Sequence, residues 1–319
     1  MQENIIFVFP GQGAQYIGMG ADLFQEYAAA RYAFEQVSDL SRRDIAKIAF
    51  SGPADELNTP ENTSLATFAH SVAVADIISS EFGVPMYKVA YALAGHSAGQ
   101  YAALYCAGSI SMEDSVSLLS ARAAYMSCVS GGMACIVGLD ITTLADVIVR
   151  AAAHGFVQVS NHNSRDQFVI SGEIPAIEKA LALAKEAGAR LTLRLNVALP
   201  AHCALMRPAA DLMRTRIDSI QFESPKTNWF SNQTANVMNN PIDVKNALAD
   251  QMVHGVRWFE IMQKFPEYKI TRAYELGPGR VLSRLISKTA EAKCRASDAG
   301  TVSTVRIMLD ELRKNMMAR

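Results

Sequence analysis

The chain has 319 residues, of which 50% are hydrophobic and 19% charged, and its formal net charge is −1. This length and composition exclude a disordered or fibrous protein and fit one large globular domain or two smaller ones. A net charge near zero argues against a general nucleic-acid binder, so we expect no nucleic-acid partner.

The N-terminal sequence predicts neither a secretory leader nor a membrane anchor. Residues Met1 to Asn4 include no basic side chain, and the apolar run at 5–9 is too short for the core of a signal sequence. No apolar run approaches the roughly 20 residues that cross a bilayer. The five cysteines are scattered and form no C-x-x-C pair, which is typical of free thiols in a reducing cytosol. We therefore expect a cytoplasmic protein with no membrane partner.

Strands and helices alternate through the first part of the chain. The apolar run at 5–9 predicts a buried strand, which Pro10 and Gly11 end. Ser111 and Asp114 resemble a capping box at the start of a helix. The predicted elements, in order, are a strand at 5–9, helices at 19–38 and 64–82, a strand at 88–94, and helices at 100–107 and 111–128.

The pentapeptide Gly95-His96-Ser97-Ala98-Gly99 lies between a predicted strand and a predicted helix. G-x-S-x-G in that setting is typical of a nucleophile elbow, in which the glycines permit so sharp a turn that the serine projects from its apex. The N–H of Ala98 then points, with the helix dipole, to where an oxyanion forms. A tight turn without a catalytic role is the alternative. The strand–turn–helix context favours a nucleophilic Ser97.

The pattern of the chain changes near Gly131. The next predicted elements are a strand at 134–139, a helix at 142–153, strands at 157–161 and 168–171, a helix at 174–188 and a strand at 191–197. This βαββαβ order is typical of a ferredoxin-like unit. A helix at 204–217 and a strand at 272–275 follow. We therefore predict an α/β fold with a parallel sheet, formed by residues 1–130 and 199–319, into which a ferredoxin-like subdomain at 131–198 is inserted.

A serine nucleophile needs a base, and the candidates are the six histidines. His202 stands out because it follows Pro200, where a predicted strand ends and a helix begins, a junction like that of the serine. We interpret His70 as packed or satisfied at the surface, and we expect His96 to point away from Ser97. The histidines in polar or glycine-containing stretches are expected to be exposed; these are His154, His162 and His254. No acidic residue has a comparable setting, so the residues alone predict no Ser-His-Asp triad.

Arg122 is the second strong signal. The predicted helix places it on an apolar face, with Leu118 one turn before it and Tyr125 one turn after it. A guanidinium in that position is unfavourable unless an anion meets it. A snorkelling side chain or a structural ion pair is the ordinary explanation. A ligand carboxylate held by two parallel hydrogen bonds is the functional alternative.

The sequence lacks the common nucleotide-binding and metal-binding motifs. Residues 10–15 are glycine-rich and follow the first strand, but Tyr16 takes the place of the third glycine of a dinucleotide fingerprint, and no G-K-[ST] is present. We expect this loop to lend a backbone N–H to the site. H-E-x-x-H is also absent, so the sequence predicts no metal.

Taken together, these motifs closely resemble the malonyl-CoA:acyl carrier protein transacylases of fatty acid synthesis. The resemblance runs from the first strand to about Lys288 and implies an α/β-hydrolase-like large domain with a ferredoxin-like subdomain. The segments that carry it are residues 9–15, 95–99, Arg122, residues 200–203 and residues 277–279.

The resemblance implies roles for individual residues. Ser97 would be the acylated nucleophile, His202 its base, and Gln251 the residue whose carbonyl orients the histidine, which gives a Ser-His dyad without an acid. Arg122 would bind the malonyl carboxylate. The N–H groups of Gln12 and Ala98 would form the oxyanion hole, and Asn161 would lie in an asparagine-rich loop beside the pocket.

The implied reaction is a ping-pong transfer from a coenzyme A thioester to the phosphopantetheine thiol of an acyl carrier protein. It needs no cofactor, and we expect a monomer. Because carrier proteins are acidic, we expect a basic surface near the cleft, although solvation explains its four candidates equally well: Arg257, Lys264, Lys288 and Arg295.

The chain departs from the family pattern near the nucleophile. Ala98 stands where a bulky aliphatic residue is usual and predicts a larger acyl pocket, Gln100 replaces a glutamate, and Ala201 replaces the serine before the histidine. Arg165-Asp166 replaces Pro-Gly, and Ser64 stands where glutamine is common. Three alternatives therefore remain: a polyketide synthase acyltransferase using another extender unit, an acyl-carrier hydrolase, and a non-enzymatic interaction protein. The retained Arg122 weighs against the hydrolase, and the intact Ser97–His202 set weighs against the last.

Overall fold

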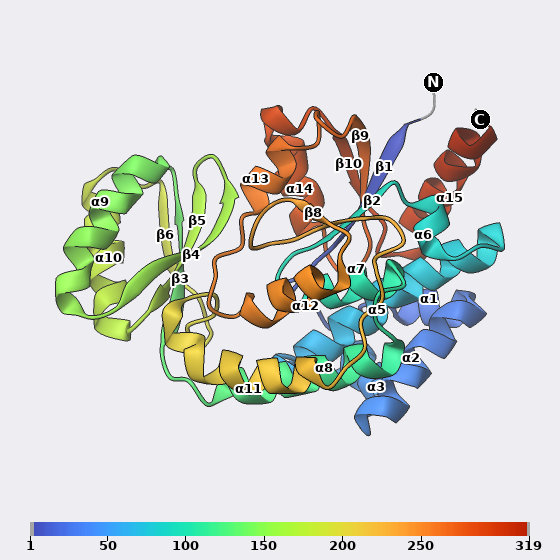
Figure 1. The fold of residues 1–319 in the computed structure, drawn as a ribbon, viewed down its shortest axis with the longest axis horizontal. Coiled ribbons are helices and arrows are strands. Elements are labelled where there is room, and N and C mark those ends of the chain that lie inside the picture. The colour runs from blue at the N-terminus through green and yellow to red at the C-terminus, as the bar shows by residue number, and fades with distance from the viewer. Residues whose placement is uncertain (1–2, 318–319) are drawn as a thin grey trace.

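The computed structural model describes residues 3–317 of the chain (Figure 1). Met1 and Gln2, on which part of the leader prediction rests, lie outside the described residues, as do the outer ends of the predicted large domain. Figure 1 shows a larger layered body with both termini on one side and a smaller sheet with two helices beside it. Within 3–317, no helix is long and apolar enough to cross a membrane.

The larger sheet has six strands within the described residues, in the order β10-β9-β1-β2-β7-β8. Neighbouring strands are parallel except for the last pair, β7 and β8. Their bounds are β10 Arg295–Asp298, β9 Ile270–Glu275, β1 Asn4–Phe9, β2 Ala92–Gly95, β7 Asn228–Phe230 and β8 Val237–Met238. The predicted α/β class with a parallel sheet is confirmed.

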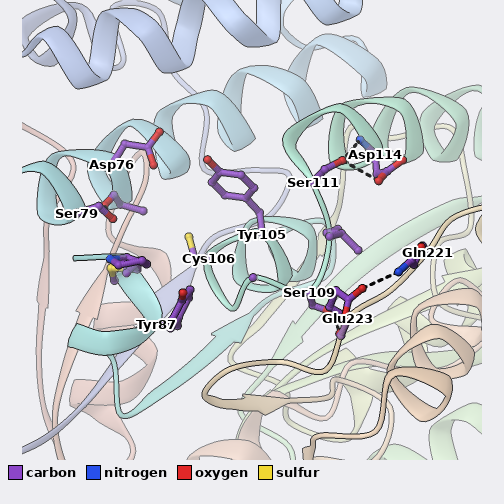
Figure 2. Close-up of a pocket in the computed structure, with 15 residues that line it drawn as sticks. Asp76, Ser79, Tyr87, Tyr105, Cys106, Ser109, Ser111, Asp114, Gln221 and Glu223 are labelled. Carbon is purple, nitrogen blue, oxygen red and sulfur yellow. Dashed lines mark hydrogen bonds between the residues drawn. The ribbon is translucent and has the colours of Figure 1, made fainter. Parts of the chain in front are cut away.

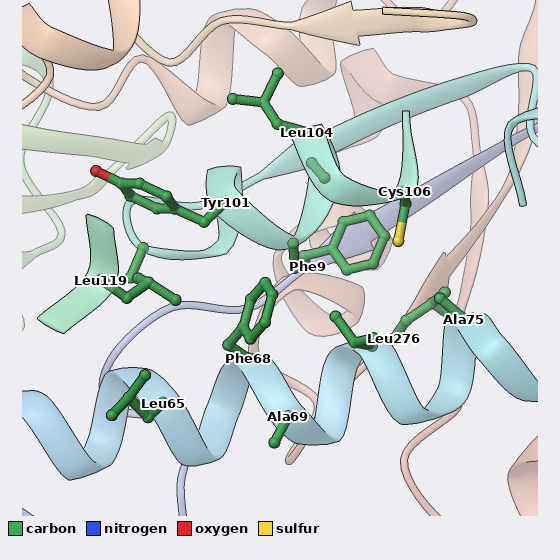
Figure 3. Packing of buried hydrophobic residues seen from close by; sticks show 14 of the residues in the cluster. Phe9, Leu65, Phe68, Ala69, Ala75, Tyr101, Leu104, Cys106, Leu119 and Leu276 are labelled. Atoms are coloured by element: carbon green, nitrogen blue, oxygen red, sulfur yellow. The ribbon is translucent and has the colours of Figure 1, made fainter. Parts of the chain in front are cut away.

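Strand β1 shows why this sheet is covered on both faces. Phe7 and Phe9 belong to one hydrophobic cluster and Ile6 and Val8 to another, because successive side chains of a strand point to opposite faces. An apolar run without alternation is the pattern of a parallel strand buried on both sides. In Figure 3, the ring of Phe9 lies among Phe68, Leu276 and other residues of the first cluster.

Helices enclose the larger sheet. Helices α13 Trp258–Gln263 and α14 Val281–Lys288 contribute Trp258 and Ile286 to the cluster on one face. The other helices before residue 130 are α1 Ala21–Glu26, α2 Ala28–Ser41, α3 Ile45–Ser51, α4 Ala54–Leu57, α5 Pro60–Phe82, α6 Met86–Val89, α7 Gly99–Cys106 and α8 Met112–Ser127. Those after residue 200 are α11 Arg207–Asp218, α12 Pro241–Asp250 and α15 Val302–Met317.

Several predicted boundaries were wrong; for example, the strand expected at 191–197 ends at Arg194. The helix expected at 19–38 is two helices, because Tyr27 has an extended backbone with φ −115° and ψ 126°. Helix α5 begins before residue 64, since Thr59 caps it by accepting from the N–H of Asn62 and Pro60 occupies its first turn. The strand expected at 88–94 begins only at Ala92, because the residues before it form helix α6.

The smaller sheet is antiparallel, with strands in the order β4-β5-β3-β6 and helices α9 and α10 packed against it. Its elements are β3 Gly132–Val137, α9 Ile141–Ala151, β4 Val157–Ser164, β5 Gln167–Gly172, α10 Ile174–Glu186 and β6 Leu191–Arg194. This is the predicted βαββαβ order. That residues 131–198 form a separate subdomain stays a prediction.

Main-chain contacts join the smaller sheet to the larger body. The N–H of Val256 donates to the carbonyl of Ser160 at 2.8 Å, and the N–H of His162 donates to the carbonyl of Val256 at 2.9 Å. Gly131 and Pro200, which flank the segment that forms the smaller sheet, lie against each other. A Cβ on Gly131 would be 2.7 Å from the Cγ of Pro200. The chain therefore leaves and re-enters the larger body at one place.

Candidate active site

The elbow is a sharp turn that both of its outer glycines make possible. A Cβ on Gly95 would lie 2.1 Å from the backbone of Gly99, and a Cβ on Gly99 would lie 2.1 Å from the carbonyl oxygen of Phe9. Between them, Ser97 has φ +52°, the left-handed region that a non-glycine residue adopts only when its surroundings hold it there. The close approach of β1, β2 and α7 therefore fixes the serine at the apex of the turn.

The side chains of Ser97 and His202 are hydrogen-bonded although 105 residues separate them in sequence. The distance from Ser97 Oγ to His202 Nε2 is 2.6 Å, and that from His202 Nδ1 to the main-chain carbonyl of Gln251 is 2.9 Å. A carbonyl oxygen only accepts, so Nδ1 carries the proton and Nε2 is left to accept from the serine hydroxyl. Within residues 3–317, no carboxylate hydrogen-bonds to His202, and the geometry is that of the predicted dyad.

The environment keeps His202 neutral. The side chain is buried, and burial, helped by the positive charge of Arg122, lowers the pKa of His202 to about 3 from an ordinary value of 6.5. The hydrogen bond to Gln251 opposes this shift but does not offset it. At neutral pH the imidazole is therefore unprotonated and able to take a proton from Ser97.

Arg122 reaches the same serine from helix α8. It is 3% exposed, and its Nη2 donates to Ser97 Oγ at 3.1 Å. Its Nε is buried without a hydrogen-bond partner, and no salt bridge to it forms within the described residues. Burial lowers the pKa of Arg122. A snorkelling side chain and a structural ion pair both fail to describe this arginine, whose charge lies without a described ion-pair partner beside the Ser97 hydroxyl.

The loop after β1 packs against the elbow. A Cβ on Gly11 would lie 2.5 Å from the carbonyl oxygen of His96 and 3.5 Å from the amide nitrogen of Ala98. Ala98 caps the N-terminus of α7, and Gln12 follows Gly11 on the exposed side of this loop. The two expected oxyanion donors thus come from adjoining segments.

Three buried amide side chains surround the elbow, and sequence reasoning gave a role to only one of them. Gln251 Nε2 donates to the carbonyl of Ser97 at 2.9 Å and to Gln100 Oε1 at 3.1 Å. Asn232 Oδ1 accepts from the N–H of Ser97 at 2.8 Å. Asn232 follows β7, a strand of three residues that was too short to be predicted. The available signal was a polar residue two positions after the apolar pair Trp229-Phe230.

The asparagine-rich segment contacts the elbow through Asn163, which was not predicted. Asn163 Oδ1 lies 2.9 Å from His96 Nε2, so His96 turns toward β4. Asn161 is buried, accepts from Ser160 Oγ at 3.0 Å and bridges to Val256. Its role in substrate binding stays a prediction.

The remaining histidines differ in burial. His70 is packed, with Nε2 2.9 Å from the carbonyl of Gly300. The expectation that His162 is exposed was wrong, because its ring lies 4.7 Å from that of Phe168 and 4.9 Å from that of Phe259. His154 and His254 are exposed.

Two of the four basic candidates for a carrier surface are paired. Arg257 bonds Glu260, and Arg295 bonds Glu3 at 2.8 Å. Their charge is therefore partly offset, whereas Lys288 is exposed at the end of α14.

No group of three or more His, Cys, Asp or Glu side chains within 3–317 is placed to hold a metal ion. A cavity of about 460 Å³ lies between α5, α7 and the start of α8 (Figure 2). It is lined by Asp76, Tyr105 and Cys106 among others, and by neither Ser97 nor His202. This cavity is separate from the candidate active site.

Known proteins share this fold and sequence pattern. The malonyl CoA-acyl carrier protein transacylase of Haemophilus influenzae is 37% identical over 290 residues, which are 90% of this chain and 92% of that protein. The solved transacylase of Coxiella burnetii has a TM-score of 0.92 at 34% identity and covers 98% of both chains. A malonyl-transacylase solved in complex with a type II PKS acyl-carrier protein has a TM-score of 0.92 at 33% identity, covering 97% of this chain and 99% of that one. The acyl transferase domain model matches residues 6–316, nearly the whole chain, so this protein belongs to the acyl transferase family.

Proposed function

We propose that this chain transfers a malonyl group from malonyl-CoA to the phosphopantetheine thiol of an acyl carrier protein, and so supplies extender units for fatty acid synthesis. One observation carries the proposal: Ser97 Oγ lies 2.6 Å from a neutral histidine nitrogen and 3.1 Å from a buried guanidinium. A base activates the serine, and the cation suits an acyl group that ends in a carboxylate. The names of the relatives support the same substrate and carrier.

The first half of the reaction acylates the serine. Ser97 Oγ attacks the thioester carbonyl carbon while His202 Nε2 takes the hydroxyl proton. The negative charge on the carbonyl oxygen is met by the N–H groups of Ala98 and Gln12. The C–S bond then breaks, and coenzyme A leaves as a thiol with the proton returned by His202.

The second half repeats these steps with the carrier as nucleophile. His202 deprotonates the phosphopantetheine thiol, which attacks the ester carbonyl. The C–O bond to Ser97 breaks, and the serine recovers its proton from His202. A thioester is consumed and a thioester is formed, so the transfer needs no cofactor or external energy source.

Arg122 selects the acyl group. Its Nε and Nη2 lie on one edge of the guanidinium; Nε is unpaired, and Nη2 bonds only the serine hydroxyl. That edge can donate two parallel hydrogen bonds to the free carboxylate of a malonyl group. Asn161 is proposed as a further substrate contact from the smaller sheet.

One chain supplies the whole proposed set of Ser97, His202, Arg122 and Gln251, which supports an active monomer. The five cysteines are all free, which supports a cytoplasmic location.

Intact-mass measurement tests the proposal. Malonyl-CoA should add one malonyl group to the wild-type chain and none to Ser97→Ala, and a holo carrier protein should then remove it. Methylmalonyl-CoA and acetyl-CoA run in parallel test the alternative extender unit. An adduct on Ser97→Ala would place the nucleophile elsewhere, and an adduct lost to water as quickly as to the carrier would identify a hydrolase.

A further inference from the structure

The elbow holds Ser97 in a conformation that its own backbone disfavours. Ser97 has φ +52°, and the peptides on either side of His96 leave β2 before α7 begins. The N–H of His96 still donates to the carbonyl of Phe9 at 2.9 Å, but other main-chain groups in such a turn find partners neither in the sheet nor in the helix. A side chain from another part of the molecule is needed to satisfy them.

Asn232 satisfies two of these groups at once. Its Oδ1 accepts from the N–H of Ser97 at 2.8 Å, and its Nδ2 donates to the carbonyl of Gly95 at 2.7 Å. The two groups flank His96, so one amide side chain clamps the strand side of the elbow. The amide orientation follows from these partners, since an oxygen must face the N–H and a nitrogen must face the carbonyl.

Asn232 is itself held at both ends of its main chain. Its N–H donates to Gln100 Oε1 at 3.3 Å, and its carbonyl accepts from the N–H of Arg257 at 3.0 Å. The residue is 1% exposed. Because Asn232 is buried and hydrogen-bonded through its own main chain, its side chain holds the main-chain groups of the turn in fixed positions.

We propose that Asn232 is a positioning residue for the nucleophile. It maintains the left-handed conformation of Ser97, and through it the contact of Oγ with His202 Nε2 and the direction of the Ala98 N–H. Only a side chain with one donor and one acceptor in this arrangement meets both main-chain groups. The inference rests on the proposed role of Ser97 as nucleophile.

Single-turnover acylation by malonyl-CoA tests the inference. In Asn232→Ala and in the isosteric Asn232→Asp, which keeps an acceptor but loses the donor, the acylation rate constant should fall about a hundredfold. The dissociation constant of malonyl-CoA, measured in a Ser97→Ala background, should stay at the parent value. Binding and acylation that fall together would show a structural role and overturn the proposal, as would unchanged acylation.

Asn228→Ala is the matched control. Asn228 begins β7, and its Nδ2 donates to the carbonyl of Tyr91 at 3.0 Å, next to the other end of β2. It makes the same kind of bond between the same two strand regions but does not touch the elbow. Its acylation rate should equal that of the wild type. A loss equal to that of Asn232→Ala would mean that any link between β7 and β2 suffices.

A double-mutant cycle covers the case in which Asn232 variants fold poorly. Glycine adopts positive φ freely, so Ser97→Gly removes the conformation that the clamp must hold. The stability lost in Asn232→Ala should then be smaller in the Ser97→Gly background. Equal losses in both backgrounds would overturn the proposal. Absence of a wild-type adduct on Ser97 would instead refute the nucleophile assignment.

Discussion

In the proposed mechanism, the protonation state of His202 sets the pH range in which Ser97 can be activated. Burial and the charge of Arg122 lower its pKa to about 3, so the imidazole stays neutral well below the ordinary histidine pKa. We expect the acylation rate of the folded protein to be nearly constant from pH 8 to pH 5. A histidine with a pKa of 6.5 would lose about thirtyfold at pH 5. Single-turnover rates across this range make the test, and a decline centred near pH 6.5 would contradict it.

The free energy of unfolding, unlike the acylation rate, is expected to fall as the pH falls through that window. The unfolded chain binds protons at histidine below pH 6.5, whereas His202 in the folded chain binds them only near pH 3 and His70 near pH 4. The unfolded state therefore takes up more protons as the pH falls, and the stability present above pH 6.5 is lost progressively toward the folded pKa values. The rates must be measured where circular dichroism shows a folded protein.

If Arg122 binds the malonyl carboxylate, as proposed, substitutions of Arg122 distinguish a malonyl transferase from a general acyltransferase. A desolvated, charge-assisted pair contributes about 1.5–3 kcal/mol, or one to two decades in kcat/KM. Arg122→Ala should therefore lower kcat/KM for malonyl-CoA by about that factor and spare acetyl-CoA. Arg122→Lys should rescue only part of the loss, because a point charge cannot make the two-pronged contact. Equal losses for both substrates would make Arg122 structural.

Individual site residues could be predicted from the sequence where a short stretch around them carries a recognisable pattern. Ser97 lies in a five-residue pattern, and Arg122 stands out on an apolar helix face. Asn232 lacks such a signal, because its contact with Ser97 spans 135 residues. Even the role of Gln251 came from resemblance, since a main-chain carbonyl has no residue type by which to recognise it.

Helix α5 shows both the strength and the limit of prediction at the scale of elements. Its apolar length was recognised, but its N-terminus depends on a threonine cap and a proline that precede the apolar run. The other long helices before residue 130 were also recognised from the length of their apolar pattern. The short strands β7 and β8, with three and two residues, carry too little pattern to be predicted.

Asp76 on α5 provides a stability test away from the active site. It lines the cavity of Figure 2, and burial raises its pKa from 3.8 to about 7. The folded state thus binds this proton more tightly than the unfolded state, and stability falls as the pH rises from about 4 through 7. Asp76→Asn should raise the free energy of unfolding on the order of 4 kcal/mol at pH 8 and hardly at all at pH 4.

Urea unfolding of both proteins at the two pH values measures this effect. Asp39→Asn, on the exposed side of α2, is the control and should show no such pH-dependent gain. A gain for Asp76→Asn that is the same at pH 4 and pH 8 would show that its cause is not the charge.

At the scale of the whole molecule, the smaller sheet has a hydrophobic cluster of its own, although Met133 and Val169 on its strands pack into a cluster of the larger body. Ile136, Leu144 and Phe168 belong to a cluster formed only by residues of the smaller sheet and its helices. The predicted division at 131–198 followed from the change in element order, since βαββαβ is a local pattern. The larger sheet could not be completed from sequence, because its strands come from both ends of the chain and β10 was not recognised.

The smaller sheet should open independently of the larger one. Its own core is small, and its described main-chain links to the larger body include the pair formed by Val256 with Ser160 and His162. Cooperative units with few contacts across their boundary open with less free energy than the whole protein. Native-state hydrogen exchange in rising urea should therefore give amides of β3, β5 and α10 one shared free energy of opening, and this energy should be lower than that of amides in β1 and β2.

The variant Asn163→Ala, which removes the bond to His96, should lower the opening energy of the smaller sheet further and leave that of β1 unchanged. A single opening energy for both sheets would refute the division at residues 131–198 and make the molecule one cooperative unit.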